Sequence, residues 1–346
     1  MKKKDVINLI RYYSEGNSSA FREQAYEIAA DFNRNGDQQL GEYILALLSD
    51  KNTFIPQELN GKSDFFRKME YSTEPLPLPT PISNDLSGIV NAIGYNAGIN
   101  KYLFSGAPGT GKTESAKQLA RVLNREVYAV DFDYVIDSRL GQTSKNIAQL
   151  FDEINSLPYP EHVIILFDEI DSLAMDRTDS RDLREMGRAT SSVLKGLDGL
   201  KNDIVLIATT NLMNSFDKAL IRRFDKVIDF NRYSQDDLLD ISVSILESLL
   251  SKFKFAGRDV SLFKKIIRLM NPIPFPGDLK NAIKSSIAFS DPSNGLDYLR
   301  RLFLQVKPDY SRDIKELKKM GFTVREIEIL SQVSKSKVAR DLSEGK

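Results

Sequence analysis

The stretch Lys101-Tyr-Leu-Phe-Ser-Gly-Ala-Pro-Gly-Thr-Gly-Lys-Thr113 decides the fold of this chain. It joins a short apolar run to the pattern G-x-x-x-x-G-K-T, which spans Gly106 to Thr113. A helical pattern follows, with small or apolar residues at Ala116, Leu119, Ala120 and Leu123. In such an arrangement the glycines let backbone N–H groups turn towards an anion, and the positive end of the helix adds to the attraction. The sequence therefore predicts a phosphate-binding loop between a strand and a helix.

The residue types in this loop suit a nucleotide with its magnesium ion. Lys112 would reach the β- and γ-phosphates, and the Thr113 hydroxyl would ligate Mg²⁺. The candidate nucleotide contacts are Gly106, Ala107, Pro108, Gly109, Thr110, Gly111, Lys112, Thr113 and Glu114. A plain Gly/Pro turn is the alternative, and three signals further along the chain disfavour it.

The first of these signals is the run Val163-Ile-Ile-Leu-Phe-Asp-Glu-Ile-Asp171. Its continuous apolar part predicts a strand that is buried on both faces of a parallel sheet. Asp168 would hold Mg²⁺ through water, and Glu169 would polarise the water that attacks the γ-phosphate. A strand that ends in acids is ordinary when it stands alone, but after a phosphate loop it indicates nucleotide hydrolysis.

Two further signals supply polar groups for the same chemistry. Ile204-Val-Leu-Ile-Ala-Thr-Thr-Asn211 is another buried strand, and Asn211 could orient the lytic water or contact the γ-phosphate. Phe216-Asp-Lys-Ala-Leu-Ile-Arg-Arg-Phe-Asp225 carries Arg222 and Arg223, cations of the kind that neutralise charge on a transferring phosphoryl group. Taken alone, the asparagine would be a turn former and the arginines solvated cations.

In this order, the four motifs resemble an AAA+ ATPase. The closer resemblance is to the AAA clade of spastin, katanin and bacterial stand-alone remodelling ATPases, and it covers residues 81–290. It implies a P-loop NTPase fold, an α/β domain whose parallel sheet is sandwiched by helices, followed by a helical lid. It also implies that ATP and Mg²⁺ are the cofactors and that ATP is hydrolysed to ADP and phosphate.

The resemblance extends to assembly and to the lid. It implies that Arg222 and Arg223 project into the ATP site of a neighbouring subunit, so that the chain forms a ring, a hexamer, with shared sites. Pro276-Gly-Asp-Leu-Lys280 resembles the start of the sensor-2 helix. Lys280 stands where several AAA+ branches have an arginine, whereas the AAA clade has no basic residue there.

Two segments are candidates for loops that line a central pore. In Asp137-Ser-Arg-Leu-Gly-Gln-Thr143, Gly141 and Thr143 fit the polypeptide-gripping pattern of AAA unfoldases. Arg139 replaces the expected aromatic residue, for which Tyr134 could substitute. The segment is also compatible with a helix entry loop, or with a ring of Arg139 side chains facing an acidic chain or nucleic acid. Residues 176–184 are a second pore loop or a solvated surface.

The chain around this core divides into five expected parts. These are a helical module at 1–60, a proline-rich linker at 61–80, the nucleotide-binding domain at 81–232, a helical lid at 233–306 and a helical tail at 307–346. Cysteine is absent, and 48 basic residues balance 48 acidic ones. With no signal peptide and no apolar run of membrane-spanning length, we expect a cytoplasmic protein without a membrane partner.

The tail carries a pattern of its own. Met320 to Arg340 resembles a helix-turn-helix of the resolvase or sigma-factor kind, with Thr323 as the cap of its first helix. Its expected core is Ile327, Leu330, Val333 and Val338. Its expected groove-facing residues are Ser334, Lys335, Ser336, Lys337 and Arg340. Glu328 and Gln332 depart from the pattern, where a small residue and a turn glycine are usual. DNA binding, protein docking and a structural role all remain open.

Two functions are therefore compatible with the sequence. The first is an ATP-driven ring that remodels or presents a protein substrate, with a separate effector such as a protease by family analogy. The second is a nucleic-acid-associated ATPase that reads DNA through its tail.

Overall fold

The computed structural model describes residues 3–14, 18–34, 44, 65–70, 77–136, 142–157, 159–173, 180–213, 217–310 and 313–343. The chain divides into two compact units, Met1–Ser63 and Asp64–Lys346. Within the described ranges, no helix is both long and apolar enough to cross a membrane.

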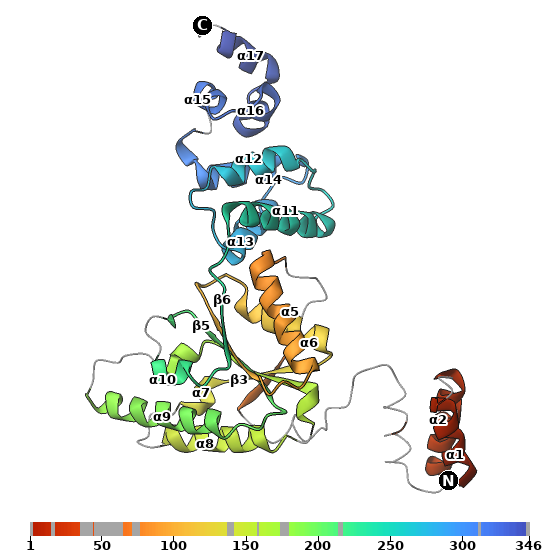
Figure 1. Cartoon of the computed structure of the whole chain (residues 1–346). Helices are drawn as coiled ribbons and strands as arrows, with labels where there is room; N and C mark the ends of the chain where they lie inside the picture. The colour runs from red at the N-terminus through yellow and green to blue at the C-terminus, as the bar shows by residue number, and fades with distance from the viewer. Residues whose placement is uncertain are drawn as a thin grey trace. The chain divides into compact units, whose positions relative to one another are not determined.

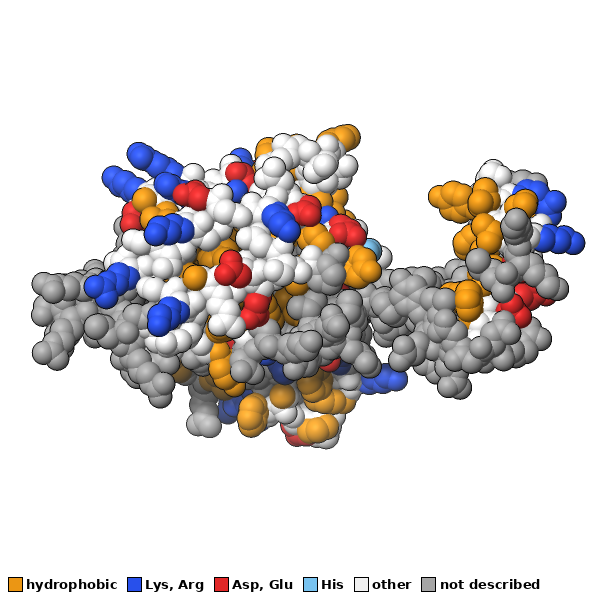
Figure 2. All heavy atoms as spheres, turned by 90° about the horizontal axis from the view of Figure 1, so that it is seen from below, with side chains coloured by type: hydrophobic (Ala, Val, Ile, Leu, Met, Phe, Trp, Pro, Cys, Tyr) orange, Lys and Arg blue, Asp and Glu red, His pale blue; other side chains and the backbone are white. Residues whose placement is uncertain are grey.

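The first unit contains two helices, α1 (Lys3–Ser14) and α2 (Ser18–Arg34). They pack through buried Ala25, Ile28 and Ala29 of α2, and the Asn8 amide donates to Gln24 Oε1 at 3.0 Å. Ile7 and Ile10 of α1 are nevertheless exposed. Figure 2 shows hydrophobic side chains on the surface of this unit. Of the helical module expected at 1–60, residues 35–60 lie outside the described residues, apart from Ile44.

The second unit is built on a sheet with the strand order β1-β3-β4-β5-β2-β6 (Figure 1). The strands are β1 (Phe66–Met69), β2 (Lys101–Ser105), β3 (Glu126–Val130), β4 (Val163–Phe167), β5 (Val205–Thr210) and β6 (Lys226–Asp229). Strands β2 to β6 are parallel, and β1 pairs antiparallel with β3. The parallel sheet was predicted. Strand β1 was not, and it lies inside the range assigned to the linker.

Helices cover both faces of this sheet (Figure 1). Alternate side chains of β4 point to opposite faces, as the pleat requires. Ile164 and Leu166 pack in one core with α5 (Thr80–Gly94) and α6 (Lys112–Leu123). Phe167 meets Phe151 of α8 (Gln142–Asn155) edge to face, with ring centroids 5.7 Å apart. The remaining helices of this domain are α7 (Phe132–Val135), α9 (Ser180–Asp198) and α10 (Lys218–Ile221). The predicted α/β sandwich is confirmed.

Four helices then form the lid. They are α11 (Gln235–Lys252), α12 (Val260–Arg268), α13 (Pro276–Ala288) and α14 (Asp297–Val306). Helix α11 begins with a capping box, since the Ser234 hydroxyl accepts the Asp237 N–H while the Asp237 carboxylate accepts the Ser234 N–H. Wholly buried side chains such as Phe263, Leu279 and Phe303 hold the four helices together.

The tail continues this lid. Its helices are α15 (Ile314–Lys319), α16 (Val324–Ser331) and α17 (Lys335–Ser343). Thr323 caps α16 in a capping box with Glu326, and Gln332 adopts the left-handed conformation (φ 57°) at the turn before α17. The tail side chains Leu317, Phe322, Ile327, Leu330 and Val338 belong to the same core as the lid helices. The tail is therefore packed as part of the lid and does not have a core of its own.

Candidate nucleotide site

The predicted phosphate loop connects β2 to α6. Gly109 and Gly111 have φ values of 77° and 92°, a conformation that favours glycine, and Gly111 is the residue before the first turn of α6. The Ala107 N–H donates to Asn231 Oδ1 at 2.9 Å, and the Thr110 hydroxyl donates to the Ala107 carbonyl at 2.8 Å. The loop is therefore fixed by Asn231 from outside and by a bond within it, and the N-terminus of α6 is directed to an anion site.

Lys112 is held inside the loop. Its Nζ donates to the carbonyls of Gly106 (2.7 Å) and Ala107 (3.0 Å) and to Asn211 Oδ1 (2.7 Å). Burial lowers the pKa of Lys112, while Asp171, Asp168 and Glu169 act in the opposite direction. Its ammonium group is thus held by three protein oxygens, which it can exchange for phosphate oxygens.

The predicted metal ligands meet beside it. The Thr113 hydroxyl donates to Asp168 Oδ1 at 2.8 Å, although the two residues come from α6 and the end of β4. A hydroxyl beside a carboxylate is a set of hard oxygen donors that suits Mg²⁺. Thr113 and Asp168 therefore fit the magnesium ion that the loop implies.

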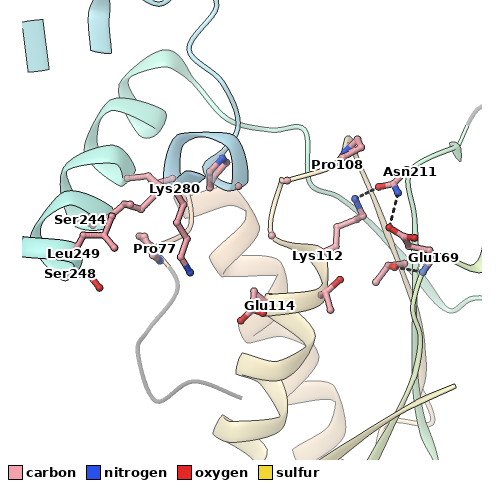
Figure 3. Close-up of a pocket in the computed structure, with 18 of the residues that line it drawn as sticks. Pro77, Pro108, Lys112, Glu114, Glu169, Asn211, Ser244, Ser248, Leu249 and Lys280 are labelled. Atoms are coloured by element: carbon pink, nitrogen blue, oxygen red, sulfur yellow. Dashed lines mark hydrogen bonds between the residues drawn. The ribbon is translucent and has the colours of Figure 1, made fainter. Parts of the chain in front are cut away.

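Glu169 and Asn211 also come together at the ends of β4 and β5 (Figure 3). The Asn211 amide donates to Glu169 Oε1 at 3.4 Å, and the Asn211 N–H donates to Asp171 Oδ2 at 3.2 Å. Glu169 is exposed and has a left-handed backbone with φ 52°. Its carboxylate can thus reach a water molecule next to the phosphate loop, with Asn211 between it and Lys112.

A cavity of about 640 Å³ extends from this centre to the lid. Loop residues and the first turn of α6, Glu114 included, form one wall. On the lid side, α11 contributes the apolar Ile241, Ile245 and Leu249, next to Pro77, and the polar Ser244, Ser248 and Lys252. Lys280 of α13 also lines the cavity, so the structure places it with the other candidate contacts (Figure 3). The cavity joins a charged end to an apolar end, as a nucleotide requires.

The lid touches the phosphate loop directly, which the sequence did not suggest. The Gly277 N–H donates to the Gly109 carbonyl at 2.8 Å, and the Tyr233 hydroxyl donates to the Thr110 carbonyl at 2.7 Å. Burial raises the pKa of Tyr233 to about 12, so the phenol keeps its proton and remains a donor. Asn231 and Tyr233 lie between β6 and α11, in a segment where no motif marked them.

Arg222 and Arg223 do not line this cavity. They follow α10, where Arg222 is exposed and Arg223 is partly buried. Both predicted trans-acting cations therefore lie away from the site formed by their own chain.

The pore segment is only partly described. Arg139 and Gly141 lie outside the described residues, as do residues 176–179 of the second candidate loop. Thr143 is buried at the start of α8, whereas the Tyr134 side chain is 59% exposed. The Asn146 amide donates to the carbonyl of Val135 at 3.1 Å and so fixes the end of α7 that carries Tyr134. Of the two candidate positions for the gripping side chain, Tyr134 is thus the one that the structure describes as exposed.

Comparison with known proteins matches the central part of this chain to one family model. Residues 102–232 match the model of the ATPase family associated with various cellular activities (AAA). An uncharacterized AAA family ATPase, y4kL, of Sinorhizobium fredii is 40% identical over 38% of this chain and 39% of that protein. The peroxisomal ATPase PEX6 of Saccharomyces cerevisiae is 28% identical over 77% of this chain and 25% of that protein. The chain thus spans well under half the length of these relatives.

The fold has a relative among solved structures. A chain of the E. coli MS115-1 HORMA:CdnC:Trip13 complex superposes with a TM-score of 0.57 at 18% identity, covering 71% of this chain and 95% of that one. At this identity the likeness concerns the fold alone.

Proposed function

We propose that this chain, whose residues 102–232 belong to the AAA family of ATPases, binds ATP with Mg²⁺ and hydrolyses it to ADP and phosphate. One observation carries the proposal. Lys112, the pair Thr113–Asp168, and the pair Glu169–Asn211 converge at the carboxyl ends of β2, β4 and β5, although they come from distant parts of the sequence.

Each residue has a defined part in this hydrolysis. Lys112 neutralises the β- and γ-phosphates, and Thr113 with Asp168 holds the magnesium ion, which when bound offsets negative charge on the phosphates. The Glu169 carboxylate accepts a hydrogen bond from a water molecule on the open side of the site. It takes a proton from this water as the water attacks the γ-phosphate. The Asn211 side chain accepts a hydrogen bond from Lys112 (2.7 Å) and donates one to Glu169 (3.4 Å). It therefore fixes the position of the glutamate relative to the phosphate-binding lysine.

The test is phosphate release by the purified full chain. Lys112→Ala should lose nucleotide binding, whereas Glu169→Gln should bind ATP and hydrolyse it about 100-fold more slowly or worse. Glu161→Gln is the matched control, because it makes the same change at an exposed glutamate before β4. Chelation of Mg²⁺ should stop hydrolysis. Equal turnover by Glu169→Gln and the wild type would refute the assignment.

We further infer that the active form is a ring, by the family resemblance a hexamer, which acts on a protein substrate or passes it to an effector such as a protease. Support for shared sites comes from the arginines after α10, neither of which lines the cavity of its own chain. Support for a protein substrate comes from Tyr134, an exposed aromatic side chain on a fixed helix end. Sedimentation with and without ATP in the Glu169→Gln background tests the assembly.

DNA binding by the tail is the second candidate, and one contact disfavours it. Glu328 Oε1 accepts the N–H of Lys335 at 3.0 Å, so a carboxylate occupies the N-terminal end of α17, where a phosphate would otherwise approach. The test is a triple variant with glutamine at Lys335, Lys337 and Arg340, all exposed. Sub-micromolar DNA binding at physiological salt that this variant loses would favour the DNA function.

A further inference from the structure

Thr209 lies between the two acids of the site. Strands β4 and β5 run parallel with Phe167 opposite Ala208, so the next residue of each, Asp168 and Thr209, are neighbours at the edge of the sheet. Thr209 is wholly buried, in a strand whose preceding residues are apolar and equally buried. A buried hydroxyl is unfavourable unless it is hydrogen-bonded, so its contacts are informative.

The Thr209 hydroxyl makes two hydrogen bonds, one to each acid. It donates to Asp168 Oδ1 at 2.7 Å and accepts the backbone N–H of Glu169 at 2.8 Å. Asp168 Oδ1 is the same oxygen that accepts the Thr113 hydroxyl. A single side chain thus fixes the carboxylate on the metal side and the peptide that carries the glutamate on the water side.

The second of these bonds holds an unfavourable conformation. Glu169 has φ 52°, in the left-handed region that side chains other than glycine rarely adopt. Strain of this kind persists where neighbouring groups impose it, and it occurs at functional sites. At this position it turns the chain sharply after β4, which directs the Glu169 side chain to the Asn211 amide. A valine at position 209 would fill the same space and would leave the Glu169 N–H without this acceptor.

We propose that Thr209 is a positioning residue for the ATPase reaction, which holds Asp168 and the strained Glu169 in register with each other. This proposal rests on the proposed ATP hydrolysis. Thr209 lies at the wall of the cavity, but it is wholly buried and its hydroxyl is engaged by both acids. The proposal therefore assigns to it no contact with nucleotide, so its loss should slow turnover and leave nucleotide affinity nearly unchanged.

The experiment compares Thr209→Val and Thr209→Ser with a neighbour of the same type. Thr210→Val is the control, because Thr210 is also wholly buried but its hydroxyl accepts the Leu212 N–H at 3.0 Å and touches neither acid. We expect Thr209→Val to lower kcat about 10- to 100-fold, the scale for a displaced catalytic group, with the Kd of a fluorescent ATP analogue within about 3-fold of wild type. Thr209→Ser should recover kcat to within about 3-fold. The Mg²⁺ concentration for half-maximal activity should rise in Thr209→Val and not in Thr210→Val.

Each outcome is decisive. A Thr209→Val enzyme with the kcat of Thr210→Val, or a Thr209→Ser enzyme as slow as Thr209→Val, overturns the positioning role. If Thr209→Val does not give the native circular dichroism spectrum, Thr209→Ala replaces it in the same comparison. A wild-type rate no higher than that of Glu169→Gln would instead overturn the ATPase assignment itself, so the two failures are distinguishable.

Discussion

The Arg223 guanidinium donates two hydrogen bonds to the Asp198 carboxylate of its own chain, from Nε to Oδ1 at 3.1 Å and from Nη2 to Oδ2 at 3.3 Å. Its neighbour Arg222 is exposed, and no hydrogen bond or ion pair of its side chain is found among the described residues. Two adjacent cations that look equivalent in sequence are therefore held differently. The Arg222 side chain is thus available to a neighbouring molecule, whereas Arg223 is bound to the last residue of α9.

Arg222→Ala should accordingly be the more damaging change. We expect it to lower ATP hydrolysis by about 10³-fold with ATP affinity retained, because an arginine finger acts on the transition state. Arg223→Ala should have a smaller effect, and Asp198→Ala should reproduce that effect if Arg223 works through this contact. Steady-state kinetics with an ATP-binding assay measures both quantities.

Mixing two inactive variants tests whether Arg222 acts in the ATP site of a neighbouring subunit. Inactive Arg222→Ala subunits combined with inactive Lys112→Ala subunits should regain activity, because some sites then receive an intact Lys112 and a neighbour's Arg222. A mixture that stays as inactive as its components would count against shared sites.

Gly277→Ala should weaken ATP binding, by about 10-fold or more. A Cβ at this position would lie 2.7 Å from Gly109 Cα, so the lid or the phosphate loop would have to move. Gly88→Ala is the control, since nothing lies within 4 Å of its added Cβ and alanine in a helix should stabilise the protein by about 0.5–1 kcal/mol. Titration of a fluorescent ATP analogue gives the affinities. Equal affinity in the two variants would show that the contact between lid and loop is not used.

Gln332→Gly should raise the free energy of unfolding. Gln332 has φ 57°, and a left-handed conformation costs a residue with a side chain about 1–2 kcal/mol. Glycine removes this cost, although its more flexible unfolded chain offsets part of the gain. Gly321→Ala, at φ 87°, makes the opposite change and should lower stability. Chemical denaturation of both variants measures the two signs, and a destabilised Gln332→Gly protein would contradict the prediction.

The lid should lose an acid-sensitive contribution to stability below about pH 4. Burial alone would raise the pKa of Glu326, but hydrogen bonds from Lys265 Nζ (2.8 Å) and from Thr323 hold that pKa below its ordinary value. A lowered pKa means that the unfolded chain binds the proton more tightly. The stabilisation is therefore present above the pKa of an unfolded glutamate, about 4.3, and is lost as pH falls through the folded value.

Thermal unfolding at several pH values tests this linkage. The wild type should exceed Glu326→Gln in melting temperature near pH 6, and the difference should shrink by pH 3. Glu247→Gln, at an exposed glutamate of α11, is the control and should show a much smaller change. A difference that is constant with pH would exclude the role of the charge.

The sequence predicted this α/β fold well because its strands are continuous apolar runs and its loop has a fixed pattern. Lys112, Asp168 and Asn211 could be named in advance, since each lies at the end of a recognisable strand or loop. Geometry that depends on two distant segments was not visible. Thr209 belongs to a quoted motif, yet its link to Asp168 depends on the register between β4 and β5.

Other features escaped prediction for similar physical reasons. Strand β1 is an edge strand of four residues that pairs with β3. Only its first and last residues are partly buried, so the sequence shows no alternating pattern of apolar residues there. The contact of Gly277 with Gly109 depends on how the lid folds back on the loop. In the tail, the helices and the cap at Thr323 were predicted, whereas the sharing of its core with the lid depends on side chains that are far apart in the sequence.

That shared core makes the lid and the tail one mechanical body. Tyr233 and Asn231, in the segment that joins this body to the sheet, are hydrogen-bonded to the phosphate loop, so a shift of the loop would act directly on this segment. Figure 1 shows α17 on the side of the lid away from β6, at the far end of this body. When a rigid body rotates, the displacement of each part grows with its distance from the axis of rotation. A rotation of the lid that follows a change at the phosphates would therefore displace α17 more than the lid helices.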